Sequence, residues 1–206
     1  MFSNKSVIGV VGSGAMGSGI AQVAATNNYK TIVFDTNSEA IEKAKKNLVS
    51  SLQKLVEKQK ISSDKSQEIL NNIEFNNSIS SLKDCDLIIE AIIENLAIKK
   101  TVFKDLEAIV SQKCVLAPNT SSLSITSIAA ACAIPERVIG IHFFNPATLM
   151  PLVEIIPGIA TDIEIANNCK SLIDSWGKTT VMAKDTPGFI VNRVARPFYS
   201  EALRIY

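Results

Sequence analysis

The sequence predicts an α/β fold, with a doubly wound, mostly parallel sheet that has helices on both faces. Two observations support this prediction. Short apolar runs alternate with amphipathic runs over nearly the whole chain, which is typical of parallel strands joined by crossover helices. Hydrophobic residues make up 47% and charged residues 20% of the 206 residues, so the chain can bury a full core and is not expected to be disordered.

The expected strands are short runs of apolar and β-branched residues. Their continuous apolar character indicates strands buried on both faces, as in a parallel sheet between two layers of helices. In chain order these runs cover residues 6–11, 30–34, 86–89, 114–117, 138–142, 152–156 and 179–182.

The expected helices lie between these strands. Ser38 is predicted to cap the second helix, which forms an inserted helical hairpin with the third. A turn with strong breakers at 185–188 separates the last strand from the last helix. We therefore expect two domains, a Rossmann-like domain over 1–184 and, over 185–206, the truncated beginning of an all-helical domain. In chain order the helices cover residues 16–26, 39–58, 64–71, 95–111, 125–131, 163–176 and the stretch from 189 to 206.

The turn after the first strand has the pattern Gly-x-Gly-x-x-Gly. It consists of Gly12, Ser13, Gly14, Ala15, Met16 and Gly17. Because it follows a buried strand and opens a helix, it matches the turn that binds the pyrophosphate of a dinucleotide at a helix N-terminus. The alternative is a glycine-rich turn that binds no ligand.

Asp35 ends the second strand, 18 residues after Gly17. A carboxylate at this place would accept hydrogen bonds from the adenosine ribose and repel a 2′-phosphate. Thr36 and Asn37 provide no arginine to bind such a phosphate. The cofactor is therefore expected to be NAD rather than NADP. The alternative is that Asp35 only caps the end of its strand.

His142 is the only histidine and ends an expected strand, at the edge of the sheet where ligands of open α/β sheets bind. Glu154 follows 12 residues later inside the apolar run LVEII. A buried carboxylate needs a partner, and His142 is a natural one, because the carboxylate would fix the imidazole tautomer. The sequence thus favours His142 as a general base, although a structural histidine and a solvent-facing Glu154 on an edge strand remain alternatives.

Six runs in order carry a family resemblance, namely Gly12–Gly17, EAIIEN (90–95), NTSSLSIT (119–126), HFFNP (142–146), LVEII (152–156) and DTPGFIVNR (185–193). With these runs the whole chain resembles the N-terminal, NAD-binding part of the short-chain L-3-hydroxyacyl-CoA dehydrogenases, which include 3-hydroxybutyryl-CoA dehydrogenases. The stretches WGK (176–178) and NRVARPFYSEALR (192–204) more closely resemble the longer, phenylacetate-pathway type that acts on 3-hydroxyadipyl-CoA.

The resemblance implies roles for individual residues. His142 matches the catalytic base and Glu154 its carboxylate partner, while Ser121 and Asn192 match residues that contact the substrate. Ser51 and Lys58, in the helical hairpin, match contacts to the CoA part of the substrate. The positions that match contacts to NAD are Gly12, Ser13, Gly14, Ala15, Met16, Gly17, Asp35, Glu94, Lys99, Ser121 and Asn145.

The implied reaction is the NAD-dependent oxidation of an L-3-hydroxyacyl-CoA to the 3-oxoacyl-CoA, and its reverse. His142 would remove the proton of the 3-hydroxyl, while Ser121 and Asn192 stabilise charge on that oxygen. One alternative is a 3-hydroxyisobutyrate-like dehydrogenase, which shares the glycine turn but uses a lysine as acid and base. The other is a non-catalytic NAD-binding fragment or structural relative.

Composition limits the other classes of function. The formal net charge of +1 gives no indication of a nucleic acid partner, and no apolar run reaches the length of a membrane span. The four cysteines form no CxxC pair, so we expect no metal site. No secretory pattern is present, which favours the cytoplasm. A homodimer formed through the C-terminal domain is implied by the resemblance. The lysines of 43–60 form either a solvated helix face or a surface that attracts CoA phosphates.

Overall fold

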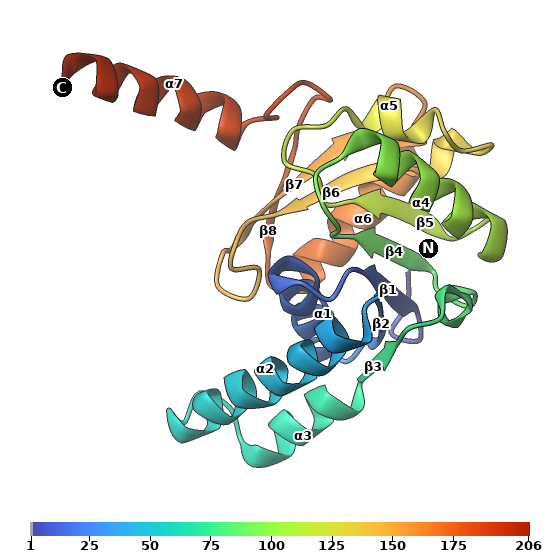
Figure 1. Cartoon of the computed structure of the whole chain (residues 1–206), viewed down its shortest axis with the longest axis vertical. Helices are drawn as coiled ribbons and strands as arrows, with labels where there is room; N and C mark the ends of the chain where they lie inside the picture. Colours follow the sequence, from blue (N-terminus) through green and yellow to red (C-terminus); the bar gives the residue numbers. More distant parts are fainter. Residues whose placement is uncertain (1) are drawn as a thin grey trace.

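The computed structural model describes residues 2–206 and contains two sheets (Figure 1). The larger sheet is fully parallel, in the order β3-β2-β1-β4-β5. The smaller has the order β6-β7-β8, with β6 antiparallel to β7 and β7 parallel to β8. An isolated bridge between Leu116 and Val138 links the two sheets. The strands are β1 (Val7–Val11), β2 (Lys30–Phe34), β3 (Ile73–Asn76), β4 (Leu87–Glu90), β5 (Val115–Pro118), β6 (Ile139–Phe143), β7 (Leu152–Pro157) and β8 (Thr179–Met182).

The helices cover both faces of the sheets. Two short 3₁₀ helices complete the fold, η1 (Ile79–Leu82) and η2 (Pro135–Arg137). The α-helices are α1 (Ala15–Thr26), α2 (Ser38–Glu57), α3 (Ser63–Asn71), α4 (Leu96–Ile109), α5 (Ile125–Ala129), α6 (Ile163–Ser175) and α7 (Val191–Ile205). This arrangement confirms the predicted Rossmann-like α/β fold.

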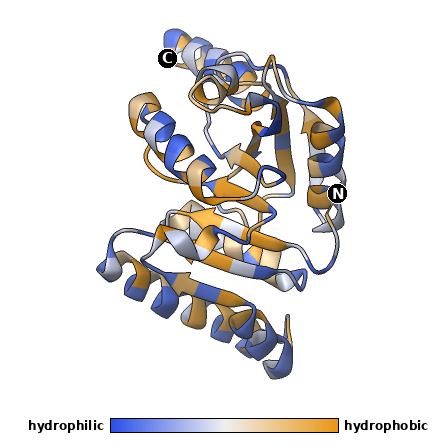
Figure 2. Cartoon of the chain, turned by 90° about the vertical axis from the view of Figure 1, so that its right-hand side faces the viewer, coloured by the Kyte–Doolittle hydropathy of each residue, from blue (hydrophilic) through white to orange (hydrophobic). Residues whose placement is uncertain are grey.

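Two apolar layers form the core, one on each side of the strands. On one side α1 and α6 pack on the sheets through residues such as Ile20 and Ile173, and on the other side α4 and α5 pack through Phe103, Leu106 and Ile128. Burial of this apolar surface is the main favourable contribution to folding. Figure 2 shows the hydrophobic strands inside and the hydrophilic faces of the helices outside.

The α2–α3 hairpin packs on a small apolar cluster of its own, in which Leu48, Leu52 and Ile69 contact Ala25 of α1. The predicted cap of α2 is wrong by one residue. Ser38 is the first helical residue, and the side chain of Asn37 accepts hydrogen bonds from the N–H groups of Glu39 and Ala40. Strand β3, which joins the sheet beside β2, is not among the strands expected from the sequence.

Helix α7 extends away from the two sheets (Figure 1) and has no buried residue. Large apolar side chains, among them Val194, Phe198 and Leu203, are more than two-thirds exposed. Among residues 2–206, no helix has both the length and the apolar composition required to cross a membrane.

Candidate active site

The glycine turn lies between β1 and α1, as the sequence predicted. Gly12 has a φ of +100°, a conformation that L side chains rarely adopt, and a Cβ there would lie 2.9 Å from the carbonyl oxygen of Ala91. A Cβ on Gly17 would lie 1.8 Å from the carbonyl oxygen of Gly12. These two glycines allow the tight turn and the close packing of helix and strand.

Gly14 differs from Gly12 and Gly17, because a Cβ at this position would have no atom within 4 Å. The turn is therefore open at Gly14. Gly14 is also the N-cap of α1, and no side chain caps the helix there. Uncapped N–H groups and the positive end of the helix dipole together attract an anion. The residues present thus fit the pyrophosphate of a dinucleotide.

Asp35 lies directly after β2, beside the glycine turn. One of its oxygens accepts hydrogen bonds from the N–H and the hydroxyl of Ser13, both at 2.8 Å, and the other accepts from the N–H of Asn37 at 3.0 Å. Burial opposes ionisation, but these hydrogen bonds outweigh it and lower the pKa of Asp35. The carboxylate is therefore charged at neutral pH, as repulsion of a 2′-phosphate requires.

A cavity of about 350 Å³ opens beside the glycine turn. It brings together residues that are far apart in the sequence, from the α1 turn, the loops after β4 and β5, the end of β6 and the start of α7. Phe144 and Asn119 are among the other residues that line it. The predicted site residues that line it are Met16, Glu94, Ser121, His142, Asn145 and Asn192.

His142 and Glu154 face each other across the antiparallel pair β6–β7, where they occupy opposite positions in the register. The Nδ1 atom of His142 lies 2.7 Å from Oε2 of Glu154, and Glu154 is fully buried. The central position of β7 in its sheet rules out the solvent-facing alternative for Glu154. With Nδ1 bound to the carboxylate, Nε2 is the nitrogen left for a substrate hydroxyl.

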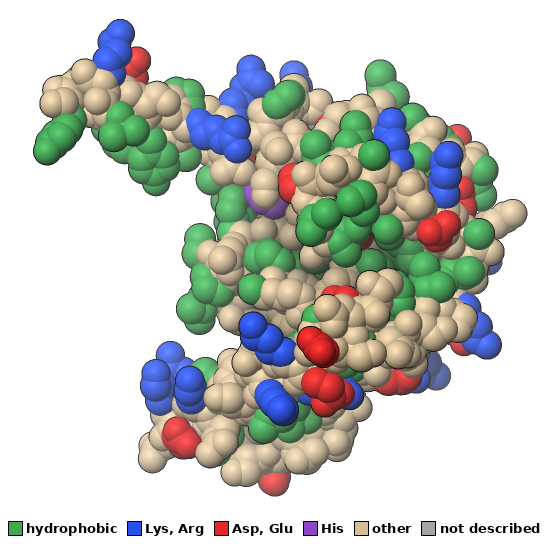
Figure 3. Space-filling view, viewed as in Figure 1, with side chains coloured by type: hydrophobic (Ala, Val, Ile, Leu, Met, Phe, Trp, Pro, Cys, Tyr) green, Lys and Arg blue, Asp and Glu red, His purple; other side chains and the backbone are tan. Residues whose placement is uncertain are grey.

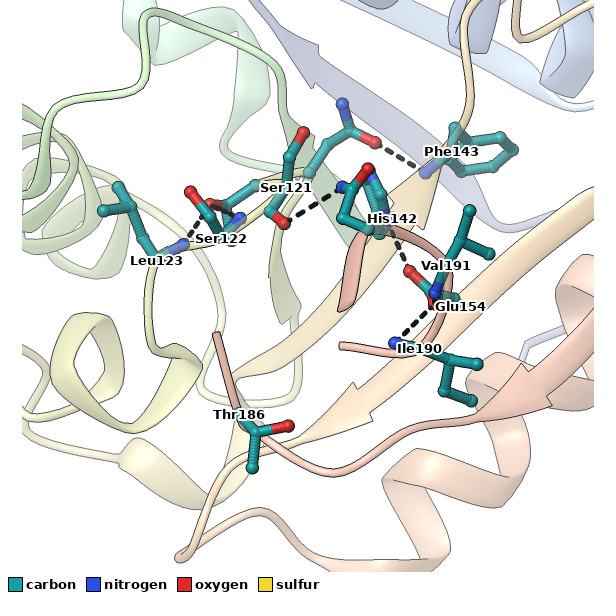
Figure 4. A network of polar contacts seen from close by, with 12 residues as sticks. Ser121, Ser122, Leu123, His142, Phe143, Glu154, Thr186, Ile190 and Val191 are labelled. Atoms are coloured by element: carbon teal, nitrogen blue, oxygen red, sulfur yellow. Dashed lines mark hydrogen bonds and ion pairs between the residues drawn. The ribbon is translucent and has the colours of Figure 1, made fainter. Parts of the chain in front are cut away.

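The second oxygen of Glu154 accepts hydrogen bonds from the N–H groups of Ile190 and Val191, both at 2.9 Å (Figure 4). Burial raises the pKa of Glu154, but the bonds from His142 and from these two N–H groups outweigh burial and lower it. Glu154 is therefore ionised, and Nδ1 of His142 is protonated and donates to it. In this tautomer Nε2 carries a lone pair and can accept a proton.

The imidazole is also held by aromatic contacts. Its ring centroid lies 4.5 Å from that of Phe144 and 5.7 Å from that of Phe189, and both rings are tilted toward it. Tilted pairs at these distances are favourable. The ring of His142 is therefore fixed in the direction that Glu154 gives it, and Figure 3 shows the histidine in the hollow beside α7.

Ser121 and Asn192 come from segments 71 residues apart and meet at the cavity. The Nδ2 atom of Asn192 donates to the carbonyl oxygen of Ser121 at 3.4 Å. Glu94 accepts from the N–H of Ser121 at 2.9 Å and from the hydroxyl of Thr120. Glu94 thus anchors the loop that presents Ser121 to the cavity.

Lys99 is buried and does not itself line the cavity, although its partner Glu94 does. Its Nζ atom lies 2.5 Å from Glu90 and 3.5 Å from Glu94. A direct contact between Lys99 and NAD stays a prediction, because the ammonium group of Lys99 is occupied by these two carboxylates in the structure.

A second cavity, of about 520 Å³, runs from the glycine turn along α1 and α2. Ser51, predicted to contact CoA, lines this cavity, and so does Lys43 from the lysine-rich part of α2. Lys58 is the C-cap of α2 and is exposed, outside the residues that line the cavity. The structure therefore brings Ser51, but not Lys58, to this cavity.

Residues 7–186 match the protein family described as "3-hydroxyacyl-CoA dehydrogenase, NAD binding domain". The chain belongs to the 3-hydroxyacyl-CoA dehydrogenase family. Its cofactor is accordingly NAD, as the sequence predicted.

Named relatives agree with this membership of the 3-hydroxyacyl-CoA dehydrogenase family. The chain is 43% identical over 204 residues to the 3-hydroxyadipyl-CoA dehydrogenase of Escherichia coli K12. This alignment covers 99% of the present chain and 43% of that relative. The chain is also 43% identical over 194 residues to the probable 3-hydroxybutyryl-CoA dehydrogenase of Bacillus subtilis, with coverage of 94% and 68%. The chain thus spans less than half of one relative and about two-thirds of the other.

Solved structures show the same fold. The crystal structure of the 3-hydroxybutyryl-CoA dehydrogenase from Escherichia coli K12 matches with a TM-score of 0.96 at 43% identity, and the alignment covers 98% of this chain and 43% of that one. The (S)-3-hydroxybutyryl-CoA dehydrogenase from Ralstonia eutropha matches with a TM-score of 0.94 at 37% identity, with coverage of 96% and 70%.

Several residues that shape the site were not singled out from the sequence. The side chain of Asn119 accepts a hydrogen bond from the N–H of Phe143 at 2.8 Å and so holds the end of β6. Thr120 and Glu90 orient Glu94 and Lys99. Asn119 directly follows β5, and this position at a strand end is the signal that could have identified it. Among residues 2–206, no cluster of three or more His, Cys, Asp or Glu could hold a metal ion.

Replacing Asp35 with Asn should narrow the preference for NADH over NADPH by about 10-fold, because one charge repelling a 2′-phosphate is removed. The amide keeps an oxygen that accepts a hydrogen bond from Ser13. Fluorescence titrations of Asp35→Asn and the unchanged protein with both cofactors measure this ratio. An unchanged ratio would mean that Asp35 only caps its strand.

Proposed function

We propose that the protein oxidises an L-3-hydroxyacyl-CoA to the 3-oxoacyl-CoA with NAD and catalyses the reverse reaction. The observation that carries this proposal is the His142–Glu154 pair at a cavity that Ser121 and Asn192 also line. The printed names of the relatives support it, since they describe dehydrogenases of 3-hydroxyadipyl-CoA and 3-hydroxybutyryl-CoA. These names differ in the acyl group, so the proposal concerns the class of CoA thioester.

The residues of the cavity divide the chemistry between them. Bound NAD supplies the acceptor for the hydride that the substrate carbon loses. His142 takes the hydroxyl proton at Nε2, and Glu154 stabilises the imidazolium that results. Ser121 and Asn192 hold the substrate oxygen by hydrogen bonds that strengthen as negative charge develops on it. The glycine turn and Asp35 hold the dinucleotide, Glu94 contacts it, and Asn145 lies at the nicotinamide end.

The CoA part of the substrate is proposed to lie along α1 and α2, in the second cavity. Lys43 and Ser51 line this cavity, so a positive charge and a hydroxyl are available to a phosphate. Lys58, at the C-terminal end of α2, lies outside this cavity and would contact only a part of CoA that extends beyond it. This placement gives the lysine-rich face of α2 a function in attracting CoA.

The proposal is tested by offering the protein NAD⁺ with L-3-hydroxybutyryl-CoA, its D-isomer, or 3-hydroxyisobutyrate. Formation of NADH with the L-thioester, and not with the other two, is expected. NADH formed from free 3-hydroxyisobutyrate would instead support the dehydrogenases that use a lysine. A titration with NADH in the same experiment separates loss of turnover from loss of cofactor binding.

A second proposal concerns residues 185–206. We propose that they begin a second, helical domain and that a homodimer forms through that domain. The exposed apolar side chains of α7 support this, because large apolar groups such as Phe198 and Leu203 are stabilised by a protein partner. The hydrophobic side chains of α7 are visible in Figure 3.

The protein is further proposed to act in the cytoplasm. Its four cysteines are free, and three of them are buried. Free thiols fit a reducing compartment. Fractionation of the source cells with an antibody against the chain tests this location.

Replacing Glu154 with Gln should reduce turnover by roughly 100-fold and leave NADH binding unchanged. The reason is the tautomer, since a Gln amide placed to donate to Nδ1 would leave the proton on Nε2, where it blocks the base. Glu107→Gln is a matched control, because Glu107 also accepts from two backbone N–H groups and from a basic side chain, but lies away from the cavity. Equal effects of the two variants on turnover would contradict a role for Glu154 in catalysis.

A further inference from the structure

Residues 185–192 comprise most of the loop between β8 and α7 together with the first two residues of α7, and we call them the connecting segment. The segment supplies Asn192 to the cavity and passes beside the imidazole of His142. Its end is held by Glu154, which accepts from the N–H groups of Ile190 and Val191 (Figure 4). Glu154 thus holds the two residues directly before Asn192.

Asp185 holds the start of the connecting segment. Its carboxylate accepts hydrogen bonds from the hydroxyl of Ser124 at 2.9 Å and from the N–H groups of Ile125 and Thr126, both at 2.8 Å. These donors form the N-terminal end of α5, where Ser124 is the N-cap. Burial opposes ionisation of Asp185, but its hydrogen bonds outweigh burial and lower its pKa. A charged carboxylate thus binds free N–H groups, which gives a strong contact.

The chain just before α5 is the loop that carries Ser121. Asp185 therefore joins the loop of Ser121 to the segment of Asn192, in addition to the contacts that Glu94 makes with the first and Glu154 with the second. The hydrogen bond from Nδ2 of Asn192 to the carbonyl oxygen of Ser121 is long, at 3.4 Å, and does not by itself fix the distance between these two residues.

The middle of the connecting segment is under constraint as well. Phe189 has a φ of +46°, a conformation that costs energy for a bulky residue, and it is nevertheless buried against His142. Such a conformation persists only where the contacts on both sides impose it. The contacts are those of Asp185 before Phe189 and of Ile190 and Val191 after it.

We propose that Asp185 is a positioning residue for the reaction, which acts by fixing Asn192 and Ser121 at the separation that the substrate oxygen requires. The inference rests on the proposed function of this cavity. Asp185 does not line the cavity, so its effect on the substrate is exerted through the two segments that it joins.

Asp185→Asn is the test variant, because it keeps the shape of the side chain and removes the charge and one acceptor oxygen. Asp174→Asn is the matched control. Asp174 also accepts three hydrogen bonds, from Lys170 and from the N–H and hydroxyl of Thr180, but it joins α6 to β8 away from the cavity. Turnover of acetoacetyl-CoA, NADH affinity, thermal unfolding and amide hydrogen exchange are measured for both variants.

The kcat of Asp185→Asn is expected to fall about 10-fold or more, because small displacements of positioning groups reduce rate strongly. NADH affinity should stay within about twofold, since the glycine turn is untouched. Asp174→Asn should lose melting temperature without losing kcat. If both variants lose kcat in proportion to their loss of melting temperature, Asp185 is merely structural and the inference is overturned.

Hydrogen exchange separates failure of this inference from failure of the proposed function. Exchange at 119–124 and 188–193, beyond the amides that Asp185 binds directly, should be about 10-fold faster in Asp185→Asn and unchanged in Asp174→Asn. This result is independent of turnover, so it supports the inference even if the unchanged protein oxidises no NADH. Unchanged protection in both stretches would overturn it.

Discussion

Replacing His142 with Asn should reduce the turnover of acetoacetyl-CoA by about 10²- to 10⁴-fold, the usual contribution of a general base. The Asn amide can donate to Glu154 in place of Nδ1, so the buried carboxylate keeps a partner. It carries no group at the position of Nε2 that could give a proton to the substrate oxygen in this direction or accept one in the oxidation. The variant should fold and bind NADH as the unchanged protein does.

Steady-state kinetics and a fluorescence titration with NADH measure the two effects separately. His142→Ala is a useful companion variant, because it removes the base and also leaves one oxygen of Glu154 without its partner. It should therefore lose melting temperature as well as turnover. Turnover of His142→Asn within about threefold of the unchanged protein would exclude His142 as the base.

The second large effect is expected at the glycine turn, where two substitutions of the same kind should act differently. Gly17→Ala places a Cβ 1.8 Å from the carbonyl oxygen of Gly12, so the turn must move. A cost of roughly 3 kcal/mol or more is expected, which lowers the melting temperature by roughly 10 °C in a domain of this size.

Gly14→Ala adds a Cβ where no atom lies within 4 Å. Its φ of −63° suits an alanine, so the melting temperature should change little. The methyl group instead stands where the pyrophosphate approaches the backbone, and NADH affinity should fall by about 10-fold or more. Calorimetry and NADH titration of the two variants separate folding from binding. A Gly14→Ala protein with full NADH affinity would show that the dinucleotide does not approach the turn at Gly14.

Local sequence patterns were sufficient to predict most elements. Strands such as Lys30–Phe34 and Thr179–Met182 were predicted with their observed bounds, because they are apolar runs between clear breakers. β3 was missed because Ile73–Asn76 has no fully buried residue and follows α3 without a glycine or proline. It is a strand because it pairs with β2, and a contact of this kind is not encoded in its own four residues.

In the site as well, features encoded in local sequence could be predicted and features that depend on tertiary contacts could not. The pairing of His142 with Glu154 could be predicted, because a buried carboxylate requires a partner and the chain has a single histidine. The contacts of Asp185 with α5 could not, since they join residues about 60 positions apart and depend on how the last loop folds back. The burial of Lys99 between Glu90 and Glu94 could not be predicted from the sequence either. Charged residues are rarely buried unless they are paired, and this pairing is seen only in the folded chain.

The most direct test of the central claim is the oxidation of NADH by this protein in the presence of acetoacetyl-CoA, with His142→Asn measured beside it. We expect oxidation that requires the CoA thioester, is much slower with NADPH, and is lost in His142→Asn. Oxidation that proceeds equally well in the variant, or binding of NADH with no oxidation in the presence of acetoacetyl-CoA, would contradict the assignment of His142 as the catalytic base.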